Sequence, residues 1–253
     1  MRLGPVSLRQ AYTERTSMCG RYLITSSPEA FRRLFGYREE PGFPLRYNVA
    51  PTQPVPIVRV ARDGAREGVM VRWGLIPYFT RGEPPRFSTI NARIETLETA
   101  PSYREPWQRG QRCLQIASGF YEWHLDAQGR KAPYFVHLAD QDVFAFAGLW
   151  ERSRKADGSV IESCVLITMP ANALLREVHN AGANPYRMPA ILREQDHEAW
   201  LHGTRDQARS VLQPYPADLT VAYEVGARVN SPDNNDAQLI EPVHAATGAD
   251  PAR

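Results

Sequence analysis

The sequence has few cysteines and no long apolar run, and both features limit the class of protein to which it can belong. Cys19, Cys113 and Cys164 lie far apart with no Cys-x-x-Cys pair, which argues against a disulfide framework or structural zinc site and favours a reducing compartment. No run approaches the ~20 apolar residues that a membrane-spanning helix needs. Residues 1–17 lack the apolar centre of a secretory signal. We therefore expect a cytoplasmic protein without membrane contacts.

An excess of charge of either sign is also lacking. The 30 Lys and Arg residues nearly balance the 28 Asp and Glu residues, so the net charge is only +2. A nucleic-acid site would therefore have to be a local groove. Only Lys131 and Lys155 are lysines, and the arginines that dominate suit bidentate phosphate contacts, although a GC-rich genome also explains this bias. No nucleotide or metal motif is present, and we expect no cofactor and no metal.

The composition that is present belongs to a folded domain. The 253 residues are 43% hydrophobic and 23% charged, which suffices for a sizeable core. Many short strand-like segments with scattered short helices predict an α+β fold, a single domain built on a curled, mostly antiparallel, barrel-like β-sheet with short peripheral helices. We expect residues 1–17 to be a disordered or untranslated extension, 18–229 to form the domain, and 230–253 to be a mobile polar tail.

Local patterns predict the elements of this domain. Ser27 and Pro28 predict the start of a helix that Gly36 ends, and Asn91 is expected to cap a helix. Residues 46–53 are neither helical nor alternating, and we expect an ordered loop there. Strands are expected at 19–25, 55–60, 68–73, 112–117, 120–124, 163–168 and 220–222, a hairpin at 134–138 and 143–149, and helices at 171–178, 194–202 and 206–212.

The pair Met18-Cys19 carries the most specific chemistry. Once a methionine is removed, a cysteine behind it becomes N-terminal and presents an amine and a thiol on adjacent carbons. Such a 1,2-aminothiol condenses with an aldehyde to an imine and closes a five-membered ring, which an internal cysteine cannot do. The competing interpretation is a small apolar residue that opens a strand.

Five segments occur in a specific order, and together they resemble one family. They are MCGR, RYNVAPTQ, WGLIP with INARIET, GFYEW, and a histidine followed by RMPAIL, and they extend from Met18 to Leu192. This set resembles the SRAP family, the SOS response-associated peptidases. The resemblance implies a bacterial DNA-damage-response protein that binds single-stranded DNA, crosslinks abasic sites through a thiazolidine in a lyase-like reaction, and protects the lesion. It also implies association with the nucleoid when DNA is bound, and we expect a monomer.

The resemblance assigns roles to individual residues. Cys19 is the implied nucleophile, with Asn91, Glu122 and His179 as the other catalytic residues. Phosphate contacts are implied for Arg21, Arg93 and Arg187.

The chemistry of these side chains is consistent with the implied roles. A carboxyl group such as Glu122 can move the protons of imine formation, an imidazole such as His179 can hold the sugar oxygen or assist reversal, and Asn91 can position the amine. Each has a structural alternative: Glu122 as the solvent-facing position of an alternating strand, His179 as a helix cap, and Asn91 as an N-cap.

An abasic site offers no base edge, so we expect flanking bases to stack on apolar side chains. Trp73, Pro77, Tyr78 and Phe79 are the candidates, with a core position as the alternative for Trp73. Family members often have tryptophan at the position of Phe79, so stacking there is expected to be weaker.

Two departures from the family pattern bear on function. The 17 residues before Met18 block the Cys19 amine, so we expect translation to start at Met18 or the segment to be cleaved. His179 is separated from Arg187 by an insertion that either bulges outward or displaces His179. The alternatives to covalent capture are a cysteine peptidase that uses Cys19, His179 and Glu122, including self-processing at Met18-Cys19, and a non-enzymatic single-stranded DNA-binding module.

Overall fold

The computed structural model describes residues 19–38 and 42–243. The predicted extension 1–17 and residues 244–253 of the predicted tail lie outside this part of the chain. The strands are β1 (Arg21–Ile24), β2 (Arg46–Val49), β3 (Pro54–Val60), β4 (Arg66–Trp73), β5 (Asn91–Arg93), β6 (Arg112–Ala117), β7 (Gly119–Leu125), β8 (Lys131–Leu138), β9 (Phe144–Arg154), β10 (Val160–Pro170), β11 (Arg187–Pro189), β12 (Ile191–Leu192) and β13 (Thr220–Glu224).

A closed barrel of five strands forms the larger part of the fold. Its order is β10-β4-β3-β6-β9, and pairing of β9 with β10 closes it. Strands β11 and β5 extend β10, and β12 extends β9. Among the strands of the described residues, only the pairings of β10 with β4 and with β5 are parallel. The predicted α+β fold on a curled, mostly antiparallel sheet is confirmed.

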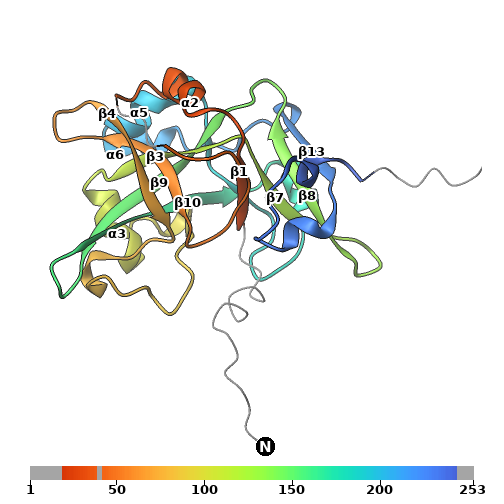
Figure 1. Cartoon of the computed structure of the whole chain (residues 1–253), viewed down its shortest axis with the longest axis horizontal. Helices are drawn as coiled ribbons and strands as arrows, with labels where there is room; N and C mark the ends of the chain where they lie inside the picture. The colour runs from red at the N-terminus through yellow and green to blue at the C-terminus, as the bar shows by residue number, and fades with distance from the viewer. Residues whose placement is uncertain (1–18, 39–41, 244–253) are drawn as a thin grey trace, which may run out of the picture.

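A second sheet lies beside the barrel and carries the N-terminal strand. Its order is β13-β8-β7-β1-β2, all antiparallel. Figure 1 shows β1 between the barrel and strands β7, β8 and β13. Because Arg21 pairs with Tyr121 across β1 and β7, the start of β1 is placed beside Glu122.

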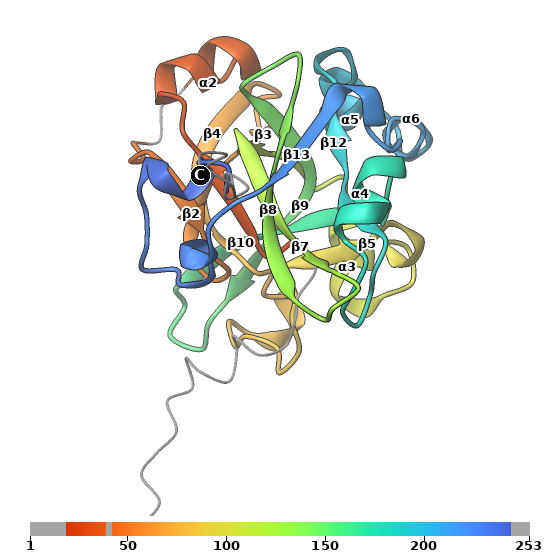
Figure 2. The same ribbon diagram turned by 90° about the vertical axis from the view of Figure 1, so that its right-hand side faces the viewer.

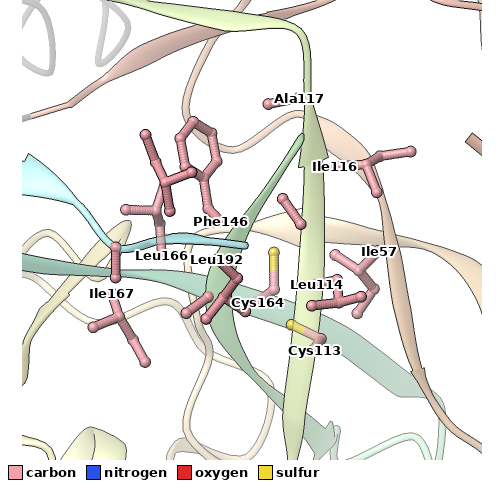
Figure 3. Close-up of a cluster of buried hydrophobic side chains, with 14 of the residues drawn as sticks. Ile57, Cys113, Leu114, Ile116, Ala117, Phe146, Cys164, Leu166, Ile167 and Leu192 are labelled. Carbon is pink, nitrogen blue, oxygen red and sulfur yellow. The ribbon is translucent and has the colours of Figure 1, made fainter. Parts of the chain in front are cut away.

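The barrel interior is filled by apolar side chains from several strands. Ile57, Leu114, Phe146 and Leu166 belong to this cluster, together with the thiols of Cys113 and Cys164 (Figure 3). Burial raises the pKa of both thiols, so they stay protonated and behave as apolar core groups.

Short helices surround the sheets, as the local sequence patterns predict. They are α2 (Pro28–Phe35), α3 (Pro101–Gln108), α4 (Ala173–Val178), α5 (His197–His202) and α6 (Arg205–Ser210). Figure 2 shows α2 on one side of the molecule and α3 to α6 on the other. The predicted cap is present: Ser27 accepts from the Ala30 amide, and Gly36 takes the left-handed conformation that ends α2.

Three local predictions are corrected by pairing between distant segments. Asn91 begins β5, which pairs with β10 through Leu166, so it does not cap a helix. The expected loop 46–53 contains β2, because residues 46–49 pair with β1. The expected hairpin of 134–138 with 143–149 is absent from these segments, since β8 pairs with β7 and β13 whereas β9 pairs with β6, β10 and β12.

The described part of the predicted tail has defined contacts. Residues 237–240 form a short 3₁₀ helix whose Leu239 is buried. The Asn48 side-chain amide donates to the carbonyl oxygens of Ser231 and Asn234. The prediction of a mobile tail from residue 230 therefore differs from the contacts over 230–243, where hydrogen bonds and the apolar side chains of Leu239 and Ile240 hold a segment that has no periodic apolar pattern.

Candidate active site

Cys19 and Glu122 meet where β1 and β7 pair. The backbone nitrogen of Cys19 donates to Oε1 of Glu122 over 2.8 Å. Cys19 is 2% exposed and Glu122 only 1%. Glu122 is therefore not the solvent-facing position of its strand, but a buried carboxyl group aimed at the nitrogen on which the proposed chemistry depends.

His179 completes this group from the end of α4. Its Nε2 lies 3.9 Å from Oε2 of Glu122. The Arg187 amide donates to Nδ1 over 3.2 Å, and the Arg187 carbonyl oxygen lies 3.1 Å from the same atom. A neutral ring that accepts at Nδ1 carries its proton on Nε2, and a charged ring can donate to the carbonyl instead. The ring thus keeps a backbone partner in either charge state.

The insertion between His179 and Arg187 closes on itself. The Tyr186 amide donates to the His179 carbonyl oxygen over 2.7 Å, and Tyr186 and Gly182 both have positive φ. Asn180 exchanges two hydrogen bonds with the backbone of Leu125 at the end of β7. The insertion therefore bulges away while His179 remains beside Glu122.

Burial dominates the electrostatics of this site. Burial raises the pKa of the Glu122 carboxyl, although His179 and the hydrogen bond from Cys19 act in the opposite direction. Burial and then the Glu122 charge raise the pKa of the Cys19 thiol well above its usual range, and Arg187 opposes this rise. A raised pKa increases the protonated fraction of the carboxyl group at a given pH, which suits a group that both gives and takes a proton.

Arg187 is buried and carries two kinds of contact. Its guanidinium donates to both carboxylate oxygens of Glu95 and to the carbonyl oxygen of Thr168. The hydroxyl of Thr168 is buried and has no hydrogen-bond partner among the described residues. The sequence patterns predicted only that Thr168 lies in a buried strand. The one sequence feature that distinguished it was a polar side chain among apolar neighbours.

Asn91 and Arg93 lie on β5, which pairs with the edge of β10 opposite to the one that pairs with β11 and its Arg187. Asn91 pairs with Leu166, and its carbonyl oxygen accepts from the Tyr103 hydroxyl. Arg93 pairs with Thr168, and its side chain is exposed. Among the three arginines assigned to phosphate contacts, Arg93 is the one whose side chain points into solvent.

Arg21 has internal partners. Its guanidinium donates to the Asn48 side chain and to the carbonyl oxygens of Val229 and Asn230, and the residue is 8% exposed. These bonds join β1 to a segment more than 200 residues away. The phosphate contact that the resemblance implies for Arg21 stays a prediction, and in this structure its guanidinium holds distant segments together.

The predicted stacking side chains divide into buried and exposed ones. The structure corrects the expectation for Trp73, whose ring is fully buried, donates from Nε1 to the Ile90 carbonyl oxygen and contacts the Tyr22 ring. Pro77 is buried as well. Tyr78 and Phe79 are 43% and 49% exposed, edge to face with each other. Among the predicted stacking residues, Tyr78 and Phe79 are thus the ones with exposed rings.

Residues 19–38 and 42–243 contain no cluster of three or more His, Cys, Asp or Glu side chains able to bind a metal ion. No helix in the same ranges has the length and apolar character to cross a membrane.

The chain is similar to known proteins over most of its length. Residues 18–232 match the family model described as SOS response associated peptidase (SRAP). The Abasic site processing protein YoqW of Bacillus subtilis (strain 168) is 37% identical over 231 residues, covering 88% of this chain and 99% of that protein. The Abasic site processing protein HMCES of Gallus gallus is 27% identical, covering 89% and 78%.

Two crystal structures show the same architecture. A protein from Bacteroides thetaiotaomicron matches with a TM-score of 0.78 at 26% identity, covering 89% of this chain and all of that one. A protein from Bordetella bronchiseptica matches with a TM-score of 0.73 at 30% identity, covering 82% and 100%. With the family model matching 18–232, this chain belongs to the SRAP family.

Proposed function

We propose that this protein processes abasic sites in single-stranded DNA by covalent capture through Cys19, once removal of the preceding residues has made it N-terminal. The observation that carries the proposal is the buried contact between the Cys19 nitrogen and Oε1 of Glu122, 2.8 Å long. Removing residues 1–18 would turn that peptide nitrogen into an amine beside a carboxyl group. The relatives YoqW and HMCES are both named abasic site processing proteins, which supports the same substrate here.

The proposed reaction is a condensation that releases one water. The amine of Cys19 adds to the aldehyde of the ring-opened sugar to give a carbinolamine. Glu122 protonates the departing hydroxyl, which leaves as water, and a protonated imine forms that keeps one of the two amine protons. The Cys19 sulfur then adds to the imine carbon, the thiol proton returns to the Glu122 carboxylate, and a thiazolidine whose ring nitrogen keeps that amine proton joins protein and DNA.

The neighbouring groups fit the proton transfers of this scheme. The raised pKa of Glu122 increases its protonated fraction, so that one carboxyl group can first donate a proton and then accept one. His179 faces the second carboxylate oxygen at 3.9 Å and can pass a proton to or from the sugar hydroxyl. The raised pKa of the Cys19 thiol favours addition of sulfur after the imine has formed, when Glu122 can take the thiol proton.

We expect the DNA to contact exposed groups of the chain. Arg93 offers an exposed guanidinium for a phosphate, and Tyr78 and Phe79 offer exposed rings for flanking bases. Specificity would come from the aldehyde and from a pocket that a flexible single strand can enter.

The test separates the amine from the thiol. The form that begins at Cys19 is incubated with a single-stranded oligonucleotide that carries one abasic site, and products are resolved on a denaturing gel. Wild type should give a stable crosslink. Cys19→Ser keeps the amine and should give only an imine, seen after borohydride reduction. An oligonucleotide with its abasic aldehyde reduced to an alcohol should give none. A stable crosslink with Cys19→Ser would exclude the thiazolidine.

Self-processing at Met18-Cys19 is the second candidate. It is favoured by the positive φ of Cys19, 38°, which is strained for a residue with a side chain. Hydrolysis of the Met18-Cys19 bond would consume one water and free the amine that the first proposal needs. Purified full-length protein should then lose residues 1–18 with time, whereas a mixture of wild type and Cys19→Ala should show cleavage of the wild-type chain alone. Unchanged mass on prolonged incubation would exclude it.

A further inference from the structure

Glu95 belongs to the INARIET segment, and it is the charged residue of that segment that has no role in the proposed chemistry. It lies in the 3₁₀ helix Ile94–Thr96 that follows β5. Its Oε1 and Oε2 accept from Nη1 and Nη2 of Arg187 over 2.5 and 2.9 Å. This parallel, two-bond arrangement is the one that a guanidinium also makes with a phosphate.

The two partners of this ion pair differ in exposure. The Arg187 side chain is 8% exposed, whereas that of Glu95 is 47% exposed. Arg187 is also fixed from the interior, because Nη2 donates to the Thr168 carbonyl oxygen over 2.8 Å. Glu95 can therefore turn into water with little desolvation penalty, while the guanidinium stays in place.

The surroundings of Glu95 are those of an anion site. The hydrogen bond from Arg187 is the first cause of a lowered pKa for the Glu95 carboxyl, and the charges of Arg187 and Arg93 add to it. Arg187 thus holds this carboxylate directly and Arg93 adds a weaker attraction, so that a position favourable for an anion is filled by the chain's own carboxylate.

We propose that Glu95 is an internal stand-in for a DNA phosphate. The Glu95 carboxylate pairs with Arg187 in the free protein and must be displaced when single-stranded DNA binds. This inference rests on the proposed function, because the competing anion is the backbone of the captured strand. The displacement makes non-covalent binding of intact DNA weak, and stable attachment then depends on the aldehyde. Glu95 thereby sets how strongly the protein discriminates a lesion from ordinary single-stranded DNA.

The test measures binding without crosslinking. Glu95→Gln keeps the shape of the side chain but removes its charge. Affinity is measured by fluorescence anisotropy with a labelled oligothymidine that has no abasic site. Glu95→Gln should bind about 2- to 10-fold more tightly than wild type, the range expected from releasing a partly exposed ion pair.

A matched variant controls for the change in net charge. Glu224 also forms a two-bond pair, with Arg130, over 2.7 and 3.4 Å. Glu224→Gln alters the net charge by the same amount, and its affinity for the oligothymidine should stay within about twofold of wild type. Equal gains for the two variants would show a general charge effect and overturn the inference.

A double variant locates the effect at Arg187. In an Arg187→Ala background, Glu95→Gln should give no gain beyond that of Glu224→Gln, because no guanidinium is left to be released. Thermal unfolding checks that the variants fold, and if Arg187→Ala does not, the comparison of the two glutamine variants decides.

The inference and the proposed function fail differently. Unchanged or weaker binding by Glu95→Gln, together with normal crosslinking of an abasic oligonucleotide by wild type, would overturn the role of Glu95 alone. Absence of any crosslink with wild type would overturn the proposed function, and the inference with it.

Discussion

Replacing Glu122 with glutamine tests the proposed proton transfers with the smallest change of shape. The amide oxygen of glutamine can still accept from the Cys19 nitrogen, which lies 2.8 Å from Oε1. The amide cannot give or take a proton near neutral pH. Orientation of the nucleophile is therefore kept, and acid–base catalysis is removed.

The expected loss of rate follows from the part that Glu122 plays. General acid–base catalysis contributes about 10²- to 10⁴-fold to a reaction. We expect crosslinking by Glu122→Gln, in the form that begins at Cys19, to be at least about 100-fold slower, equal to about 2.7 kcal/mol of activation free energy. His179 stays 3.9 Å from the substituted position and has no carboxylate to relay to.

The expected effect on stability has the opposite sign. Burial raises the pKa of folded Glu122 above the ~4.3 of an unfolded glutamate. Between these two values the folded state binds more protons, so the free energy of unfolding falls as pH rises through this interval. Above the folded pKa the whole penalty of the buried charge is present. In the full chain, Glu122→Gln should thus be at least as stable as wild type at pH 8.

Two assays decide this prediction together. Crosslinking is followed by quenched time points on denaturing gels, and the midpoint of thermal unfolding is recorded from pH 4 to pH 8. The midpoint of wild type should fall relative to that of Glu122→Gln as pH rises. A crosslinking rate within about threefold of wild type would refute the role of Glu122. The electrostatic argument would be refuted if the stability of the variant relative to wild type were lower at pH 8 than at pH 4.

Three further predictions concern stability, DNA binding and the other thiols. Arg21→Ala should lower the free energy of unfolding by about 2–4 kcal/mol in chemical denaturation, because buried carbonyl oxygens such as that of Val229 lose a charged donor. Phe79→Ala should weaken binding of single-stranded DNA in anisotropy by about 1–3 kcal/mol with an unchanged unfolding midpoint, since its ring is half exposed. Cys113→Ala should crosslink at the wild-type rate, and neither Cys113 nor Cys164 should react with a thiol reagent in the native protein, because both are fully buried; rapid modification would contradict this.

The fold class could be predicted because it depends on local patterns. Ser27 and Gly36 mark the ends of α2 through capping and a left-handed residue, and both signals act within a few residues. Pairing partners are not encoded in this way. The segment at Asn91 has a helix-cap pattern, yet it pairs with Leu166, 75 residues later, and that contact decides its conformation.

The residue types of the candidate site could be predicted from the sequence. The burial of those residues could be predicted less well. The GFYEW and MCGR segments identified Glu122 and Cys19, and the β1–β7 pairing brings them together. Arginine at position 21 has the same chemistry whether it meets a phosphate or a carbonyl. Its partner Val229 is 208 residues away, so only the fold reveals which of the two it contacts.

The central claim is that an N-terminal Cys19 captures the aldehyde, and intact-mass spectrometry tests it most directly. One form of the protein begins at Met1 and another at Met18, and each is incubated with a single-stranded oligonucleotide that carries one abasic site. The account predicts that protein whose first residue is Cys19 gains the oligonucleotide mass less one water, and that protein retaining residues before Cys19 gains nothing. An equal gain by protein that retains those residues, or by Cys19→Ala, would contradict it.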